Sequence, residues 1–231
     1  MASAAPHLPR VIVNMAMSLD GKVSSRSREP VTFTSREDRR HLLRLRARAD
    51  AIVIGAGTAS IDRQTLGIPD PGIQRQRQRR GIPPHPLRII VSGRLSLSPR
   101  LKLLHIPISP LLFVCTKQAP VKRQRLFAKM GCVLVCGRRE VDLPRLLEIL
   151  AADCKVKTLV CEGGPTLNDA FFRAGLVDEL FVTLLPCLVG GTDAPTLAEG
   201  RGFSTLKQAA RGRLISLKQG CAECFLRYRF A

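Results

Sequence analysis

The 231-residue chain has no tryptophan and one tyrosine, and aromatic residues make up only 4% of it. Proteins that bind single-stranded nucleic acid stack bases on aromatic rings, so this composition argues against such a role. Acidic residues are also scarce, because 18 Asp and Glu stand against 37 Lys and Arg, for a net charge of +19. The basic residues are scattered and form no nucleic-acid motif. We expect a phosphorylated ligand rather than nucleic acid, and a basic nucleic-acid-binding module remains an alternative.

Long apolar runs are missing as well. No run approaches the roughly 18 residues that cross a bilayer, and residues 1–10 lack the basic and apolar regions of a signal peptide. We therefore expect no membrane partner and a cytoplasmic location. Buried free thiols in a reducing compartment are expected at five of the eight cysteines, which lie in or beside Val- and Leu-rich runs: Cys115, Cys132, Cys136, Cys161 and Cys187.

Signatures of metal sites and of hydrolases are also absent. Cys221-Ala-Glu-Cys224 has metal-like spacing, but zinc takes about four ligands and no second Cys-x-x-Cys or His pair accompanies it. The chain has no Gly-x-Ser-x-Gly and no Gly-x-x-x-x-Gly-Lys-Ser/Thr, and its four histidines are isolated from one another. We expect no bound metal, no Ser-His-Asp hydrolase and no nucleotide triphosphatase.

Apolar runs of strand length alternate with helix-period stretches along most of the chain. This alternation predicts βαβ units and an α/β fold with a largely parallel sheet. The runs show little polar alternation, as expected for strands covered by helices on both faces. The expected strands are residues 10–15, 51–55, 87–92, 111–116, 132–136, 158–161 and 179–185, with a final pair near 214–218 and 224–229.

Helix signals lie between these runs. Ser35 and Asp38 form a start like a capping box, for a helix that runs to about Ala49. Further helices are expected over residues 120–130, 142–153 and 165–174. Residues 67–86 are expected to be a surface insertion, in which the basic run from Arg75 to Arg80 is a solvated loop. We predict one domain over residues 10–231 after a flexible tail, residues 1–9.

A glycine turn at residues 159–167, Leu-Val-Cys-Glu-Gly-Gly-Pro-Thr-Leu, carries the clearest chemical signal. Gly163 and Gly164 allow the backbone to approach a ligand, Pro165 suits the first turn of a helix, and the free N–H groups of that turn attract an anion. Glu162 adds a carboxyl group at the strand's carboxyl end, where open α/β sheets bind ligands. On its own, this pattern also fits an ordinary strand-to-helix turn.

Two other turns also follow an expected strand. Residues 55–60, Gly-Ala-Gly-Thr-Ala-Ser, copy the start of the dinucleotide fingerprint but lack its third glycine and its later acid. They predict a second phosphate-binding turn without standard Rossmann topology. Asp20-Gly21 is a turn signal that would free Lys22 to reach a polar substrate, although a plain hairpin or loop explains it too.

Four motifs taken in order resemble the reductase family of riboflavin biosynthesis, known as the RibD C-terminal reductase domain. They are Met17-Ser-Leu-Asp-Gly-Lys22, Thr34-Ser-Arg-Glu-Asp-Arg-Arg40, Arg46-Ala-Arg-Ala-Asp-Ala-Ile-Val-Ile-Gly-Ala-Gly-Thr58 and Glu162-Gly-Gly-Pro-Thr-Leu167. The resemblance implies a dihydrofolate-reductase-like fold from about Arg10 onward, with antiparallel strands at the carboxyl end. It implies a stand-alone form, because the zinc deaminase signature of fused enzymes is absent.

The resemblance also implies an activity. The expected reaction is NADPH-dependent hydride transfer to C1′ of a phosphoribosylamino-pyrimidine, which turns the ribosyl chain into a ribityl chain. The pyrimidine is either the deaminated pyrimidinedione or the 2,5-diamino-pyrimidinone. A reductase of the same fold that acts on a pterin or dihydrofolate is the alternative. A homodimer is expected by analogy with the family.

Site residues follow by position from the resemblance. Glu162 is expected to assist ring opening or to protonate the substrate nitrogen, and Lys22 to polarise the pyrimidine carbonyl. Arg46 is expected to bind the substrate phosphate. Arg63 is expected to replace an arginine that is missing near Pro69, and the other substrate-binding residues are Leu66 and Asp20. The expected cofactor-binding residues are Met17, Thr32, Thr58, Asp62, Ser92, Gly163, Gly164, Pro165, Thr166, Leu167 and Asn168.

Overall fold

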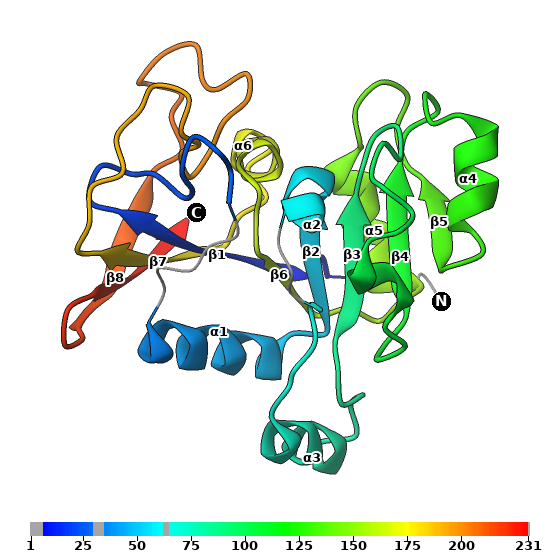
Figure 1. Ribbon diagram of the computed structural model, residues 1–231, viewed down its shortest axis with the longest axis horizontal. Helices are drawn as coiled ribbons and strands as arrows, with labels where there is room; N and C mark the ends of the chain where they lie inside the picture. The colour runs from blue at the N-terminus through cyan, green and yellow to red at the C-terminus, as the bar shows by residue number, and fades with distance from the viewer. Residues whose placement is uncertain (1–6, 30–34, 62–64, 231) are drawn as a thin grey trace.

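The strands of the computed structural model form one sheet across the residues it describes, 7–29, 35–61 and 65–230 (Figure 1). They are β1 (Arg10–Ser18), β2 (Ala51–Gly55), β3 (Leu87–Val91), β4 (Leu111–Cys115), β5 (Cys132–Val135), β6 (Thr158–Cys161), β7 (Glu179–Leu185), β8 (Gly212–Gln219) and β9 (Cys224–Phe230). The order in the sheet is β5-β4-β3-β2-β6-β1-β7-β9-β8. Neighbours from β5 to β7 run parallel, and β9 is antiparallel to β7 and β8.

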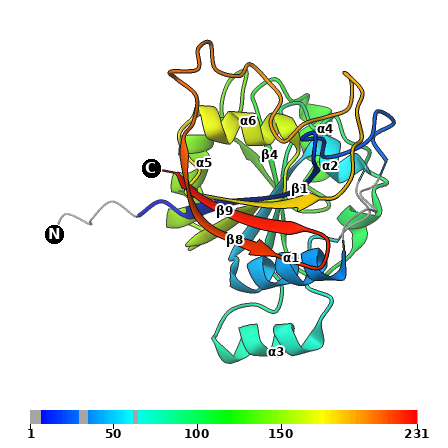
Figure 2. The same ribbon diagram turned by 90° about the vertical axis from the view of Figure 1, so that its left-hand side faces the viewer.

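Helices cover both faces of this sheet. They are α1 (Arg36–Arg48), α2 (Ala56–Ile61), α3 (Pro71–Arg79), α4 (Val121–Phe127), α5 (Leu143–Ala152) and α6 (Pro165–Arg173), with the short 3-10 helix η1 (Lys102–His105). Figure 2 shows α6 above the sheet, α1 below it and α3 beyond α1. These elements confirm the predicted α/β architecture with helices on both faces and antiparallel strands at the carboxyl end.

Two buried apolar clusters lie on the two sides of the sheet. In β2, Ala51 and Val53 pack in the cluster that holds α5 and α6, whereas Ile52 and Ile54 pack in the cluster that holds α1 and α4. Successive side chains of a strand point to opposite faces, so a strand buried on both sides needs apolar residues at every position. This explains why the unbroken apolar runs predicted the central strands well.

The start of α1 differs from the predicted capping box. Ser35 Oγ accepts hydrogen bonds from the N–H groups of Glu37 (3.1 Å) and Asp38 (3.0 Å), as expected. The N–H of Ser35 donates to Glu223 Oε1 at 3.2 Å, not to Asp38 as a capping box would require. The carboxylate of Asp38 turns inward, where its Oδ1 accepts a bond from Thr183 Oγ1 at 2.6 Å. A residue distant in sequence therefore completes the cap and leaves Asp38 for another role.

The basic run from Arg75 to Arg80 was wrongly predicted as a solvated loop, because most of it forms α3. Asp70 caps this helix by accepting bonds from the N–H groups of Gly72 (2.7 Å) and Ile73 (3.1 Å). Arg77 is 1% exposed. Its guanidinium donates to carbonyl groups at the end of α1, so α3 packs against α1 through a buried arginine.

Burial of the cysteines was predicted correctly for Cys115, Cys136 and Cys161. Complete burial raises the pKa of the Cys161 thiol to about 12. Cys187 is half-buried, and Cys132 is exposed, contrary to the prediction. Cys132 begins β5, which forms the edge of the sheet, so it is less covered than a central strand would be.

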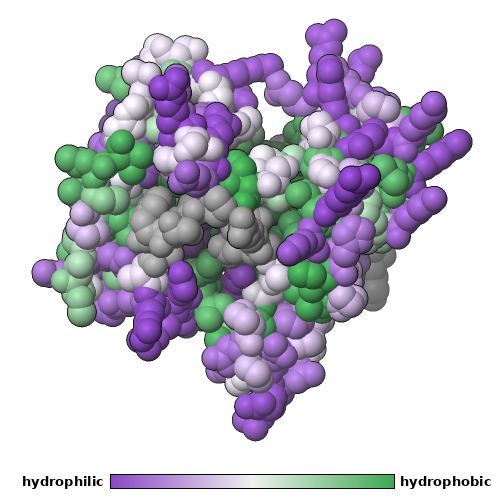
Figure 3. Space-filling view, viewed as in Figure 1, coloured by the Kyte–Doolittle hydropathy of each residue, from purple (hydrophilic) through white to green (hydrophobic). Residues whose placement is uncertain are grey.

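Hydrophilic and hydrophobic residues are mixed on the face of the molecule shown in Figure 3. In Figure 3 the hydrophilic residues are spread from α3 at the bottom to the loops at the top of this face. Within the described ranges, every helix is either too short or too polar to cross a membrane.

Candidate functional site

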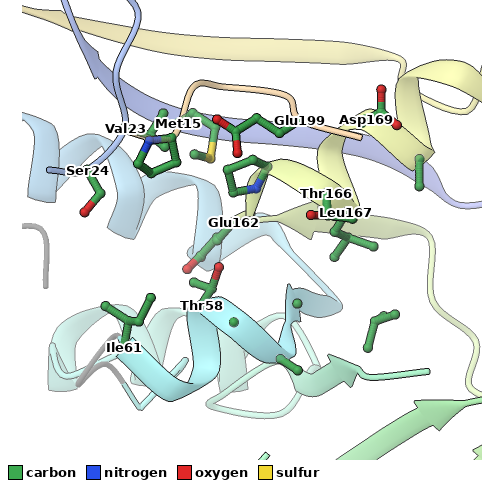
Figure 4. Close-up of a pocket in the computed structure, with 18 of the residues that line it drawn as sticks. Met15, Val23, Ser24, Thr58, Ile61, Glu162, Thr166, Leu167, Asp169 and Glu199 are labelled. Atoms are coloured by element: carbon green, nitrogen blue, oxygen red, sulfur yellow. The ribbon is translucent and has the colours of Figure 1, made fainter. Parts of the chain in front are cut away.

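A cavity of about 1200 Å³ opens at the carboxyl ends of the central strands. Its walls come from β1, from α1, from the turns that start α2 and α6, and from the loop that holds Glu199. Figure 4 shows Glu162 and Thr58 extending into one part of this cavity, with Met15 and Glu199 on the opposite wall. Ligands bind outside the carboxyl ends of strands in open α/β sheets, so the position fits a ligand site.

Arg46 and Glu162 form a bidentate ion pair in the wall of this cavity. Arg46 Nε donates to Glu162 Oε1 at 2.7 Å, and Nη2 donates to Oε2 at 2.6 Å. Both side chains are largely buried, with 5% and 10% exposure respectively. Arg46 Nη1 donates to the carbonyl of Gly67 at 2.7 Å. The two residues that were expected to contact substrate are thus brought together, and each neutralises the charge of the other.

The two predicted glycine turns meet beside this ion pair. Gly55 N donates to the carbonyl of Gly163 at 2.9 Å, because β2 and β6 are neighbours in the sheet. A Cβ atom on Gly164 would lie 2.7 Å from Thr58 Oγ1, so only glycine leaves room for this approach. Gly164 is the N-cap of helix α6 and provides no side-chain cap. Its first turn therefore faces the cavity with the positive end of its dipole.

The predicted cofactor residues divide into three groups. Thr58, Ser92, Gly164, Pro165, Thr166 and Leu167 all line the cavity. Three others do not line it: Gly163, Asn168, whose Nδ2 donates to the carbonyl of Leu197, and Met17, which packs against the apolar core. Thr32 and Asp62 lie outside the described residues. The structure thus brings most of the predicted turn residues to the cavity.

Two other residues predicted for substrate binding or catalysis, Leu66 and Lys22, are not part of the cavity lining. Leu66 is 2% exposed and belongs to the apolar core. Lys22 Nζ donates to the carbonyl of Ala194 at 2.8 Å, so the lysine holds a loop in the described conformation. Arg63 lies outside the described residues. The roles of Leu66 and Lys22 stay predictions.

Asp20, a predicted substrate-binding residue, anchors the loop that follows β7. Its carboxylate accepts bonds from Ser18 Oγ (2.6 Å) and from the N–H groups of Val189 (3.1 Å) and Gly190 (2.7 Å). These bonds, that from Ser18 first, lower the pKa of Asp20 from 3.8 to about 2. A role in binding substrate stays a prediction.

We expect Asp20→Asn to destabilise the protein at neutral pH. A carboxyl group with a lowered pKa in the folded state stabilises above its unfolded pKa, and this contribution disappears as the pH falls through the folded pKa. The difference between wild type and variant should therefore be full above about pH 4 and shrink towards about pH 2, the pKa of the folded state. Urea unfolding of both proteins at pH 7 and pH 3 measures it. A difference that stays constant with pH would rule out this origin.

Comparison with known proteins identifies the family. A family model described as the RibD C-terminal domain matches residues 9–223. The chain belongs to the RibD C-terminal domain family. This RibD-domain chain is 36% identical to the 2,5-diamino-6-ribosylamino-4(3H)-pyrimidinone 5′-phosphate reductase of Archaeoglobus fulgidus. The alignment spans 214 residues and covers 93% of this chain and 96% of that protein. The predicted family is therefore confirmed.

Solved structures share the architecture of the RibD-domain chain. A pyrimidine reductase-like protein from Corynebacterium diphtheriae has a TM-score of 0.83 at 25% identity, covering 96% of this chain and 92% of that chain. A dihydrofolate reductase from Enterococcus faecalis, complexed with NADP(H), has a TM-score of 0.52 at 12% identity, covering 96% and 99%. These matches confirm the dihydrofolate-reductase-like fold.

Sequence reasoning missed several residues that line the cavity of the RibD domain. Asp38 was interpreted only as part of a helix cap, although it is 7% exposed and lines the cavity. Asn14 also lines it, and its buried Oδ1 has no hydrogen-bond partner in the described part of the chain. Asn14 is a polar residue inside the apolar run Val-Ile-Val-Asn-Met, and this break in the pattern was the available signal.

Proposed function

We propose that this protein is the reductase of riboflavin biosynthesis that acts on 2,5-diamino-6-ribosylamino-4(3H)-pyrimidinone 5′-phosphate. The observation that carries the proposal is the cavity in which the Glu162–Arg46 pair adjoins two glycine turns. The Archaeoglobus fulgidus relative that bears this name aligns over almost its whole length. A reductase needs two ligand positions in contact, and this cavity offers an acidic group beside a turn suited to phosphate.

NADPH is the proposed cofactor, and the residues present fit a nicotinamide dinucleotide. The first turn of α6 faces the cavity without a side-chain cap, and Gly164 allows Thr58 to approach that turn closely. Thr58, Ser92 and Thr166 would contribute hydroxyl groups. The cofactor, when bound, supplies the hydride that reduces the C=N bond at C1′ of the ring-opened sugar.

The chain's own residues are assigned to binding and proton transfer. Glu162 is assigned to relay the accompanying proton: its carboxylate, which Arg46 holds by both oxygens, takes up a proton from solvent and passes it to the substrate nitrogen. Arg46 remains the proposed phosphate-binding residue. Its Nε, Nη1 and Nη2 already donate to Glu162 and Gly67, so a phosphate would bind by displacing one of these bonds.

We expect Gly164→Ala to raise the KM for NADPH about tenfold, because the added Cβ would push Thr58 and the start of α6 apart. Steady-state kinetics with varied NADPH measure this effect. Gly72→Ala is the control, because Gly72 lies at the start of another helix, α3, and is not in the cavity lining. The same KM in Gly164→Ala and wild type would remove this turn from the cofactor site.

The activity itself is tested by following NADPH oxidation with three substrates side by side. These are the 2,5-diamino-pyrimidinone, the deaminated pyrimidinedione and dihydrofolate. Turnover of a phosphoribosylamino-pyrimidine supports the proposal. Turnover of dihydrofolate alone would replace it with a folate reductase of the same fold, and turnover of none would reject it.

A homodimer and a cytoplasmic location are part of the same proposal. Strand β8 forms an outer edge of the sheet, and its Leu214 and Leu217 are 47% and 59% exposed. An exposed strand edge with apolar side chains is suited to contact with a second copy. Light scattering after size-exclusion chromatography measures the mass, and a monomer at micromolar concentration would contradict the dimer.

A further inference from the structure

The cavity contains a buried carboxylate that the proposed hydride and proton transfers do not use. Asp38 lies in the first turn of α1 and is 7% exposed. Its Oδ1 accepts a bond from Thr183 Oγ1, and its Oδ2 has no partner within the described ranges. Because Glu223 completes the cap of α1, that helix end does not require the carboxylate of Asp38. Asp38 lines the cavity, so Oδ2 can accept a hydrogen bond from a ligand there.

A second unpaired acceptor lines the same cavity. Thr183, the partner of Asp38, stands opposite Ala16 in the register of β7 and β1. Asn14 lies two residues before Ala16, so its side chain points to the same face of the sheet. Its buried Oδ1 lacks a partner among the described residues. Asn14 Oδ1 and Asp38 Oδ2 are both acceptors, so this wall of the cavity suits a ligand edge that carries N–H groups.

The positions of Asp38 and Arg46 determine how a ligand would be oriented in the cavity. Asp38, Leu42 and Arg46 are spaced four residues apart on α1, so they lie along one face of the helix. Eight residues at 1.5 Å rise separate Asp38 from Arg46 by about 12 Å. A negative carboxylate repels a phosphate and attracts N–H groups, whereas Arg46 has the opposite preference. A substrate with N–H groups at one end and a phosphate at the other matches this arrangement.

We propose that Asp38 binds the 2-amino and N3–H groups of the pyrimidine and thereby selects the aminated substrate over the deaminated one. This inference rests on the proposed function and specifies its substrate. The 2-amino-pyrimidin-4-one ring presents two adjacent N–H donors to a carboxylate. The deaminated ring replaces one of them with a carbonyl oxygen, which repels the carboxylate and leaves it short of a bond. C6, which carries the ribosyl chain, lies across the ring from N3, so the phosphate points towards Arg46.

The test compares wild type with Asp38→Asn on both phosphoribosylamino-pyrimidines. We expect wild type to prefer the aminated substrate by about 100-fold in kcat/KM, the size of a bond to a charged group. Asp38→Asn should lose most of this preference, chiefly by losing activity on the aminated substrate. Asp70→Asn, which changes an acid at the start of α3, is the control and should keep the wild-type ratio. Thermal unfolding and the KM for NADPH verify that Asp38→Asn is folded.

Binding measured by calorimetry in the presence of NADP⁺ separates this inference from the proposed function. Wild type that binds the aminated pyrimidine more tightly, with the preference lost in Asp38→Asn, supports the role of Asp38 even without turnover. Turnover of both substrates with equal kcat/KM in wild type, or an equal loss on both in Asp38→Asn, would overturn the inference and leave the reductase assignment standing. Absence of turnover on both in wild type would reject the reductase assignment alone.

Discussion

Replacing Glu162 with glutamine is expected to lower kcat about 100-fold or more, the usual contribution of a positioned acid or base. Glu162 follows β6 directly, lines the cavity and is held by two bonds from Arg46. Glutamine keeps the shape and can still accept one of these bonds, but it cannot take up a proton and pass it to the substrate nitrogen. NADPH oxidation under saturating substrate measures kcat, and turnover at the wild-type rate would end the acid–base role.

The Arg46 partner allows the chemical effect to be separated from the structural one. Arg46→Met leaves the Glu162 carboxylate largely buried without its counter-ion, which typically costs about 3 kcal/mol or more. In the double variant Arg46→Met/Glu162→Leu no charge remains to be buried, so the free energy of unfolding should recover in part. Activity should stay low in both. A double variant that regains turnover would show that the pair is structural.

Local patterns predicted the strands and the glycine turns because each depends on neighbouring residues. Burial on both faces requires unbroken apolar runs, as in β2. The turn at Gly163 and Gly164 is marked by the glycines themselves, and Gly163 has a φ of +89°, which favours glycine. Such features follow from chain segments of five to ten residues, so a single sequence reveals them.

Pairing across the sheet could not be predicted in the same way. Arg46 and Glu162 are 116 residues apart, and they meet because β6 lies between β1 and β2 in the sheet. Asp38 looked like a helix cap because Ser35 stands three residues before it, yet Glu223 from the far end of the chain took that place. Contacts of this kind depend on strand order, which local periodicity does not encode.

Helix α3 is a second feature that depends on distant contacts and that the local sequence did not predict. Its sequence Pro-Gly-Ile-Gln-Arg-Gln-Arg-Gln-Arg has little apolar character, so it suggested a solvated loop. Arg77 is buried nonetheless, because its Nη1 donates to the carbonyls of Arg46 (3.0 Å), Ala47 (3.0 Å) and Ala49 (2.7 Å), and its Nε donates to that of Pro83 (2.8 Å). One side chain thus donates to three carbonyl groups at the end of α1, where the helix supplies few N–H partners.

Arg77→Met is therefore expected to lower the free energy of unfolding by about 3 kcal/mol, since buried carbonyls that lose a charged donor cost about 1–3 kcal/mol each and the losses overlap. Methionine fills similar space, so the loss measures hydrogen bonding rather than a cavity. Urea unfolding gives the value. Arg79→Met is the matched control, because Arg79 lies on the same helix but is exposed, and a surface substitution should change stability by less than about 0.5 kcal/mol.

The effect of Arg77→Met should extend to activity, because the carbonyl that Arg77 holds belongs to Arg46, the partner of Glu162. We expect a lower kcat in the folded variant, measured at a temperature where it remains fully native, with the KM for NADPH less affected. A fall in stability without any change in kcat would confine Arg77 to the fold. A fall in both stability and kcat would make Arg77 a positioning residue that acts through α1 on the pair of Arg46 and Glu162. The basic helix α3, between β2 and β3, would then contribute to the geometry of the cavity.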